Sequence, residues 1–344
     1  MTRIVLAFGG GPQTAREIPR LKEQHDAEVI TVTLDLGQGG VLEDVRDRAL
    51  AAGAARAHVL DVRDEFASSY IVRALKADAI YEDRYPMATS LGRPLIASKL
   101  VEVAGIEQAS IVAHGGTGND RVRLDTCVRA LNPALTVVAV VPAGPPQGTV
   151  DANLWGRALQ YGVADDPWTE APEDVYTLTK APADCPDEAA YVEISFERGV
   201  PAAINGVEMP IRELIGSLGI IAGAHGVGRI DMMENRVAGS KAREIYEAPA
   251  AVVLHAAHKE LQKMVVDTGV DRFSRAVSLQ YADTIYNGLW FAPLREALDA
   301  FIDRVQERVT GVIRMKLFKG DCRVVGRKSP FALNLHDNSL VRTV

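Results

Sequence analysis

The chain has 344 residues, of which 47% are apolar and 24% are charged. This composition is typical of a globular protein with one or two domains and excludes a disordered, collagen-like or disulfide-stabilised chain. Lys and Arg number 38 against 45 Asp and Glu, so the formal charge is −7. Such a chain has no overall positive field to attract nucleic acid or an anionic membrane. We therefore expect neither a nucleic-acid nor a membrane partner.

The cysteines Cys127, Cys185 and Cys322 are far apart and show no CxxC spacing. An odd and sparse set of this kind is typical of a reducing compartment. No apolar run approaches the ~20 residues that span a bilayer. The short apolar run at the start meets glycines at once, which indicates a core strand rather than a signal peptide. We expect a cytoplasmic protein.

The first 140 residues alternate short β-branched runs with segments of helical period. Strands are predicted at Ile4–Phe8, Val29–Leu34, His58–Val62, Ser110–Ala113 and Leu135–Val141, and helices at Val41–Ala52, Glu65–Ala77 and Pro94–Val103. Strands that alternate with helices predict βαβ units and a mostly parallel sheet. Ligands of such sheets bind at the carboxyl ends of the strands.

The segment Pro142–Gly148 is the clearest linker signal, and it predicts two domains, 1–148 and 149–344. The second half reads as α+β. We expect a strand at Tyr191–Phe196, helices at Pro249–Thr268 and Pro293–Val309, and a hairpin of Val312–Leu317 with Cys322–Val325. Both helices open with proline, which suits the first helical turn because its missing N–H would be unpaired there.

The first predicted strand runs into the sequence Gly9-Gly10-Gly11-Pro12-Gln13-Thr14-Ala15 and then a helix. A glycine-rich turn at a helix N-terminus collects backbone N–H groups where the helix dipole favours negative charge. The spacing fits neither the GxGxxG fingerprint nor the Walker loop. From the loop alone, an anion site and a plain strand-to-helix turn both stay open.

Several longer motifs resemble those of the argininosuccinate synthase family, over residues 1–330. They are Tyr81-Glu-Asp-Arg-Tyr-Pro, Thr89-Ser-Leu-Gly-Arg-Pro-Leu-Ile-Ala, His114-Gly-Gly-Thr-Gly-Asn-Asp-Arg-Val-Arg, Asn153-Leu-Trp-Gly-Arg, His225-Gly-Val-Gly-Arg-Ile-Asp, Glu234-Asn-Arg, Tyr246-Glu-Ala-Pro-Ala, Tyr286-Asn-Gly-Leu-Trp-Phe-Ala-Pro-Leu-Arg-Glu-Ala and Gly326-Arg-Lys-Ser-Pro. The resemblance implies a parallel-sheet nucleotide-binding domain of the adenine nucleotide alpha hydrolase type, followed by an α+β synthetase domain. It also implies a homo-oligomer, a dimer or a tetramer.

The resemblance implies a C–N ligase that joins L-aspartate to citrulline, or to a related ureido or amide acceptor. The family's enzyme activates the ureido oxygen of citrulline with ATP and releases pyrophosphate, and the aspartate amine then displaces AMP. ATP and Mg²⁺ are therefore the implied cofactors. The resemblance assigns no side chain as a catalytic acid or base, and we expect no metal held by the protein's own ligands.

The resemblance also carries binding roles onto residues of this chain. The acceptor contacts are Tyr85, Ser90, Asn119, Arg123, Thr149, Glu234 and Tyr246; the aspartate contacts are Thr117, Asn119 and Asp120; the ATP contacts are Ala7, Phe8, Gly9, Gly10, Gly11, Gln13, Thr14, Leu34, Gly115 and Gly118. The chemistry suits these residue types, because Arg123 offers a rigid fork for a carboxylate and Glu234 can pair with an ammonium group. Ala158, where the family has a serine, lacks the hydroxyl.

The phosphate end departs from the family. Its first loop reads Ser-Gly-Gly-x-Asp-Thr-Ser, and the positions of Ser, Asp and the last Ser are Gly9, Gln13 and Ala15 here. Pro12 has no backbone N–H to donate. A charge-assisted hydrogen bond is worth about 1.5–3 kcal/mol, so these losses predict weaker pyrophosphate binding by several orders of magnitude. The second glycine loop is shorter than the family's and lacks its lysine.

Three functions stay open on these grounds. The chain is an ATP-dependent ligase, an enzyme whose ATP chemistry is rewired or lost and which uses another activated acceptor, or a non-catalytic paralogue that binds an amino acid. Because the losses concentrate at the phosphate end, they weigh against the third.

Purely structural roles also stay open for several of these residues: packing for Tyr85 and Tyr246, an ion pair for Arg123 and Glu234, a helix N-cap for Asn119 or Asp120, and a hydrogen-bonded core role for His114.

Overall fold

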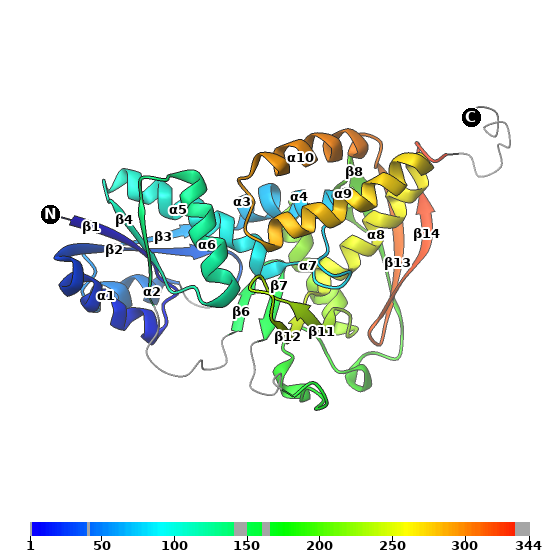
Figure 1. Cartoon of the computed structure of the whole chain (residues 1–344). Helices are drawn as coiled ribbons and strands as arrows, with labels where there is room; N and C mark the ends of the chain where they lie inside the picture. Colours follow the sequence, from blue (N-terminus) through cyan, green and yellow to red (C-terminus); the bar gives the residue numbers. More distant parts are fainter. Residues whose placement is uncertain (1, 40–41, 141–149, 160–165, 334–344) are drawn as a thin grey trace.

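The computed structural model describes residues 2–39, 42–140, 150–159 and 166–333. Figure 1 shows two lobes: a parallel sheet flanked by helices in the N-terminal part, and a larger lobe with two antiparallel sheets and long helices. In these described ranges, no helix has the length and apolar character needed to cross a membrane.

The N-terminal lobe is built on a five-stranded parallel sheet. Its strands are β1 (Thr2–Ala7), β2 (Ala27–Asp35), β3 (Arg56–Asp61), β4 (Ile111–His114) and β5 (Thr136–Ala139), in the order β3-β2-β1-β4-β5. All five predicted strands and the parallel sheet are thus confirmed. The strand order reverses between β1 and β4, and the carboxyl ends at such a switch point are where open α/β sheets bind ligands.

Helices cover both faces of this sheet. They are α1 (Pro12–His25), α2 (Glu43–Ala51), α5 (Ala88–Ile106) and α6 (Gly118–Leu131). The helical segment made of α3 (Arg63–Glu65), the π-helix η1 (Phe66–Ile71) and α4 (Val72–Lys76) packs instead against α5 and the helices of the second lobe (Figure 1). Strand residues alternate between the faces. Ile4 and Leu6 join the core cluster of α1 and α2, whereas Val5 joins the main cluster with Leu95 of α5. Helix α1 continues through Pro19 to His25.

The second lobe contains two antiparallel sheets. One has β8 (Ala190–Glu197), β9 (Val200–Ile204), β10 (Val207–Glu208), β13 (Gly311–Phe318) and β14 (Asp321–Lys328), in the order β10-β9-β8-β13-β14. The other has β6 (Val150–Asn153), β7 (Gly156–Leu159), β11 (Arg229–Asn235) and β12 (Lys241–Glu247), in the order β11-β12-β7-β6. The predicted α+β class, the strand at 191–196 and the final hairpin are confirmed.

The helices of this lobe are α7 (Ile211–Ala224), α8 (Pro249–Val265), α9 (Thr268–Tyr286) and α10 (Pro293–Gln306), with short 3₁₀ turns η3 (Glu173–Val175) and η4 (Pro182–Asp184). The helix expected to run to Thr268 is shorter, because Asp267 starts a new helix. The Asp267 carboxylate accepts a hydrogen bond from the N–H of Gly269 at 2.8 Å, which caps α9.

The two lobes share one hydrophobic core. Val5 and Leu95 of the first lobe belong to the same cluster of buried side chains as Trp155, Tyr281 and Ile313 of the second. This continuous core fixes the lobes against each other and so fixes any site built from both. The predicted linker Pro142–Gly148 lies outside the described residues.

Candidate functional site

The two glycine loops lie side by side at the switch point of the parallel sheet. Gly9, Gly10 and Gly11 follow β1, and Gly115 follows β4. A Cβ placed on Gly115 would lie 3.5 Å from Cγ2 of Thr14. The structure therefore brings together the loop residues to which the resemblance gives ATP contacts. Of the others, Ala7 ends β1, while Phe8 and Leu34 have buried side chains that belong to the core.

The first loop presents backbone groups and almost no side-chain ligands. Gly11 is the N-cap of α1 and makes no side-chain cap, and the first turn holds no acidic residue. The Thr14 hydroxyl donates to the carbonyl oxygen of Gly11 at 3.1 Å. A Cβ on Gly10, whose φ is +78°, would lie 3.0 Å from Nη2 of Arg48, so the Arg48 guanidinium lies against this loop. This arrangement favours an anion through backbone dipoles and one cation.

Three predicted acceptor contacts converge in the second lobe and its junction with α5. The rings of Tyr85 and Tyr246 stack with centroids 3.9 Å apart, and both side chains are buried. The Tyr246 hydroxyl donates to Oε2 of Glu234 at 2.5 Å, and Glu234 is only 3% exposed. A buried carboxylate with no basic partner attracts an ammonium group strongly. The ion-pair role considered for Glu234 is wrong, since its described partners are tyrosine hydroxyls.

Arg123 lies beside this group and is held from two directions. Its Nη1 donates to Oδ1 of Asp120 at 3.0 Å, and its Nε donates to the backbone oxygen of Tyr286 at 2.7 Å. Arg93 donates to the other oxygen of Asp120 at 2.7 Å. Burial disfavours the Asp120 carboxylate, but Arg93 and Arg123 outweigh it and lower its pKa to about 2. Asp120 is therefore ionised at neutral pH.

Asn119 links the first lobe to the second. Its Nδ2 donates to the hydroxyl of Tyr286 at 3.0 Å, and its Oδ1 accepts from the N–H of Val237 at 3.1 Å. The N-cap of α6 is Thr117, which makes no side-chain cap, so the N-cap role considered for Asn119 or Asp120 is wrong. Both lie inside the first turn, where their side chains turn toward the second lobe and toward two arginines.

The remaining predicted contacts lie around this centre. The Ser90 hydroxyl is buried and has no hydrogen-bond partner among the described residues. Thr117 and Gly118 are exposed at the start of α6, next to the second glycine loop. Ala158 pairs with Tyr246 across β7 and β12, so its missing hydroxyl falls beside the acceptor contacts. Thr149 lies outside the described residues.

Sequence reasoning missed three residues that the structure places in the same centre. Tyr286 bonds to Asn119 and Glu234, Tyr81 stacks on Tyr286 with centroids 3.6 Å apart, and Arg93 pairs with Asp120. All three lie inside motifs that carried the family resemblance. These motifs were the only sequence signal for the three residues, and a motif does not reveal which of its residues are in contact in the folded chain.

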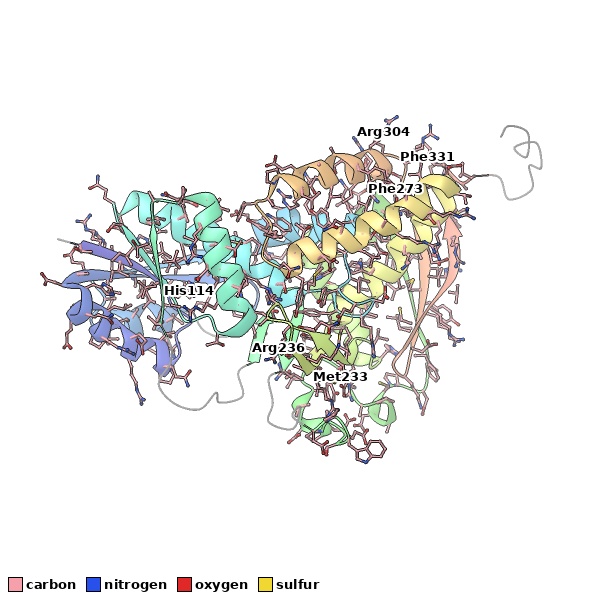
Figure 2. All side chains as sticks on the ribbon, in the orientation of Figure 1. His114, Met233, Arg236, Phe273, Arg304 and Phe331 are labelled. Carbon is pink, nitrogen blue, oxygen red and sulfur yellow. The ribbon has the colours of Figure 1, made fainter. Side chains whose placement is uncertain are left out.

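His114, His255 and His258 have structural partners. His114, at the carboxyl end of β4, contacts Asp125 at 2.8 Å through Nε2, and its Nδ1 accepts from the N–H of Gly116 at 3.2 Å. Figure 2 shows His114 in the N-terminal lobe and Arg236 where the two lobes meet. His255 and His258 contact Asp78 and Gln306. Within the described ranges, no three His, Cys, Asp or Glu residues are grouped to hold a metal ion.

A separate cavity of about 570 Å³ contains none of the predicted site residues. It lies between α4, the β8–β9 turn and α10, and its lining includes Lys76, Arg198, Asp303 and Gln306. The predicted site is thus a convergence of side chains at the junction of the lobes, and not this cavity.

Comparison with known proteins gives two family matches that together cover nearly the whole chain. An arginosuccinate synthase N-terminal HUP domain matches residues 3–151, and an arginosuccinate synthase C-terminal domain matches residues 149–343. Curated proteins named argininosuccinate synthase are also similar. Those of Trichodesmium erythraeum and Gloeobacter violaceus are each 48% identical, over 98% and 96% of this chain and 89% of each relative. That of Geobacillus kaustophilus is 46% identical over 96% of this chain and 87% of the relative.

Proposed function

The chain belongs to the argininosuccinate synthase family, and we propose that it condenses citrulline with L-aspartate while ATP is cleaved to AMP and pyrophosphate. The observation that carries the proposal is the convergence of Tyr85, Arg123, Glu234 and Tyr246, which come from separate elements of both lobes. This group offers a cation and an anion side by side, as a zwitterionic amino acid requires.

The acceptor subsite binds both ends of an α-amino acid. The buried Glu234 carboxylate takes the ammonium group, and the Arg123 guanidinium takes the carboxylate through Nη2, which makes no hydrogen bond among the described residues. The stacked rings of Tyr85 and Tyr246 form an apolar wall along the side chain. The ureido end then extends toward the glycine loops, where ATP reacts.

The aspartate subsite lies between the acceptor and the loops. Thr117 is the N-cap of α6, and Asn119 and Asp120 lie in its first turn, directly after the second glycine loop. The ionised Asp120 attracts the aspartate amine, and Asn119 holds it through donor and acceptor groups. When the ureido oxygen carries the adenylyl group, attack of this amine on the ureido carbon forms the C–N bond and releases AMP. Positioning of both partners supplies up to ~7–11 kcal/mol of the barrier.

The ATP phosphates would be held by the loop amides, the N-terminus of α1 and Arg48. No acidic side chain of the first turn of α1 is available for Mg²⁺. The ion would therefore be bound through phosphate oxygens and water, as is common for Mg²⁺. A cytoplasmic location and a dimer or tetramer stay predictions from the family resemblance.

One observation favours a second candidate function. The first loop carries Gly9, Gln13 and Ala15 in place of phosphate ligands and Pro12, which has no N–H, while the amino-acid contacts keep the family's residue types except at two serine positions, which are Thr149 and Ala158 here. An enzyme whose acceptor arrives already activated would need the amino-acid contacts but not the phosphate ligands.

Product analysis separates the two candidates. The protein is incubated with ATP, Mg²⁺, aspartate and citrulline, and AMP, pyrophosphate and the condensation product are quantified by mass spectrometry. We expect equal amounts of all three, formed only when both amino acids are present. Absence of AMP, together with aspartate binding in a calorimetric titration, would contradict ATP-dependent ligation and support the pre-activated acceptor. Absence of any amino-acid binding would contradict both.

A further inference from the structure

Tyr286 lies between the acceptor contacts and the aspartate contacts, although the family resemblance gives it no role. It is the last residue of α9, and its side chain is 1% exposed. The turn that follows it brings α9 against α6. Gly288 has a φ of +74°, and a Cβ there would lie 2.7 Å from the Cα of Arg123, so only glycine permits this approach.

The Tyr286 hydroxyl joins the two subsites by hydrogen bonds. It accepts from Nδ2 of Asn119 at 3.0 Å, a residue predicted to contact both aspartate and the acceptor, and donates to Oε1 of Glu234, which is predicted to contact the acceptor alone. The tyrosine hydroxyl is the donor in the contact with Glu234. Burial and the contact with Glu234 raise the pKa of Tyr286 far above its usual value, so the hydroxyl keeps its proton.

The ring and backbone of Tyr286 are fixed by further contacts. The ring stacks on Tyr81 with an interplanar angle of 2°, and the Arg123 guanidinium lies 4.5 Å from its centroid. The backbone oxygen accepts from Nε of Arg123. Because the ring is held in place, the hydroxyl can respond to a ligand only through its two hydrogen bonds.

We propose that Tyr286 is a positioning residue that couples the two amino-acid subsites, so that binding of the acceptor orders Asn119 for aspartate. This inference rests on the proposed function. An ammonium group at Glu234 fixes its carboxylate, the carboxylate fixes the Tyr286 hydroxyl, and the hydroxyl fixes the amide of Asn119. The second ligand then meets an ordered partner and loses less conformational entropy. Coupling of this kind is reciprocal, so aspartate strengthens acceptor binding by the same factor.

The test measures coupling without ATP. Aspartate is titrated calorimetrically into the protein with and without saturating citrulline, for the wild type, Tyr286→Phe and the control Tyr281→Phe. Phe keeps the ring contacts with Tyr81 and Arg123 and removes only the hydroxyl. Tyr281 lies on the same helix, and its hydroxyl donates to Asp299, which is outside the site. We expect citrulline to tighten aspartate binding at least about fivefold in the wild type and in the control. In Tyr286→Phe, the ratio of the aspartate affinities with and without citrulline should fall below about twofold.

Two outcomes would overturn the inference: a wild type without coupling, or a Tyr286→Phe variant that keeps the full factor. If Tyr286→Phe does not fold, 3-fluorotyrosine at position 286 keeps the side chain and makes the hydroxyl a stronger donor. The fluorinated variant should change the citrulline-dependent gain in aspartate affinity more than twofold, and an unchanged gain overturns the inference. Since these titrations contain no ATP, a protein that fails to release AMP contradicts the proposed function and leaves the coupling measurable.

Discussion

The two ends of the site are held together by different means. At the amino-acid end, buried side chains from α6, α9, β11 and β12 bind one another, with Arg123, Glu234 and Tyr286 at the centre. At the phosphate end, the first loop offers backbone amides, and Arg48 is the nearby cation. The predicted amino-acid contacts are therefore part of the buried core, whereas the predicted phosphate contacts lie in a turn whose side chains do not hold the fold together.

The largest effect is expected from Arg123→Ala at the amino-acid end. Removing a buried partner leaves Asp120 with a weaker set of contacts, and such losses cost about 3–5 kcal/mol of unfolding free energy. Citrulline binding should weaken about 10²-fold, because a charge-assisted hydrogen bond is lost. Urea denaturation and calorimetry measure the two effects.

The matched control is Arg121→Ala, an exposed neighbour on α6, which should change neither quantity. If Arg121→Ala and Arg123→Ala change the free energy of unfolding and citrulline affinity equally, the buried contacts of Arg123 do not hold the amino-acid end of the site together.

A gain of function is expected at the phosphate end. The triple change Gly9→Ser, Gln13→Asp and Ala15→Ser restores the side chains of the family pattern, and a Cβ on Gly9 meets no atom within 4 Å. We expect kcat/KM for ATP to rise about 10–100-fold, since each new hydrogen bond to phosphate contributes about 1.5–3 kcal/mol before its ordering cost. The melting temperature should stay within a few degrees of the wild type.

Arg48→Ala in the native loop is the companion variant, and it should lower kcat/KM for ATP about tenfold. ATP turnover that ignores both the triple change and Arg48→Ala would show that this loop does not bind the phosphates. The phosphate end would then lie elsewhere in the chain.

The pH dependence of stability gives a further test of the amino-acid end. The pKa of Asp120 is lowered to about 2, so its ionised form stabilises the fold at any pH above the usual range of an aspartate, near 4. This stability is lost as the pH falls from about 4 through about 2. Asp120→Asn should therefore cost on the order of 2 kcal/mol at pH 7, and progressively less at pH 4 and pH 3. Urea titrations at the three pH values give the result; a pH-independent difference would contradict it.

Local patterns were enough for the parallel sheet and the hairpin. Alternation of β-branched runs with helical segments predicts β1 to β5, because each pattern reports the burial of its own segment. Helix α9 was missed, since the apolar pattern of α8 continues across Asp267, and the sequence does not reveal that its carboxylate caps a new helix. The four-stranded sheet of β6, β7, β11 and β12 was missed because it joins two hairpins, β6–β7 and β11–β12, that lie far apart along the chain.

The family, the position of both glycine loops and the side chains absent from the first loop could all be predicted from the amino-acid sequence. Each of these is a property of neighbouring residues. Three arrangements depend on the folded chain: Tyr286 lies between Asn119 and Glu234, Tyr81 stacks on Tyr286, and Arg93 and Arg123 both bind Asp120. These contacts join residues separated by up to 205 positions (Tyr81 to Tyr286), and their distances are set by how the shared hydrophobic core packs the two lobes together.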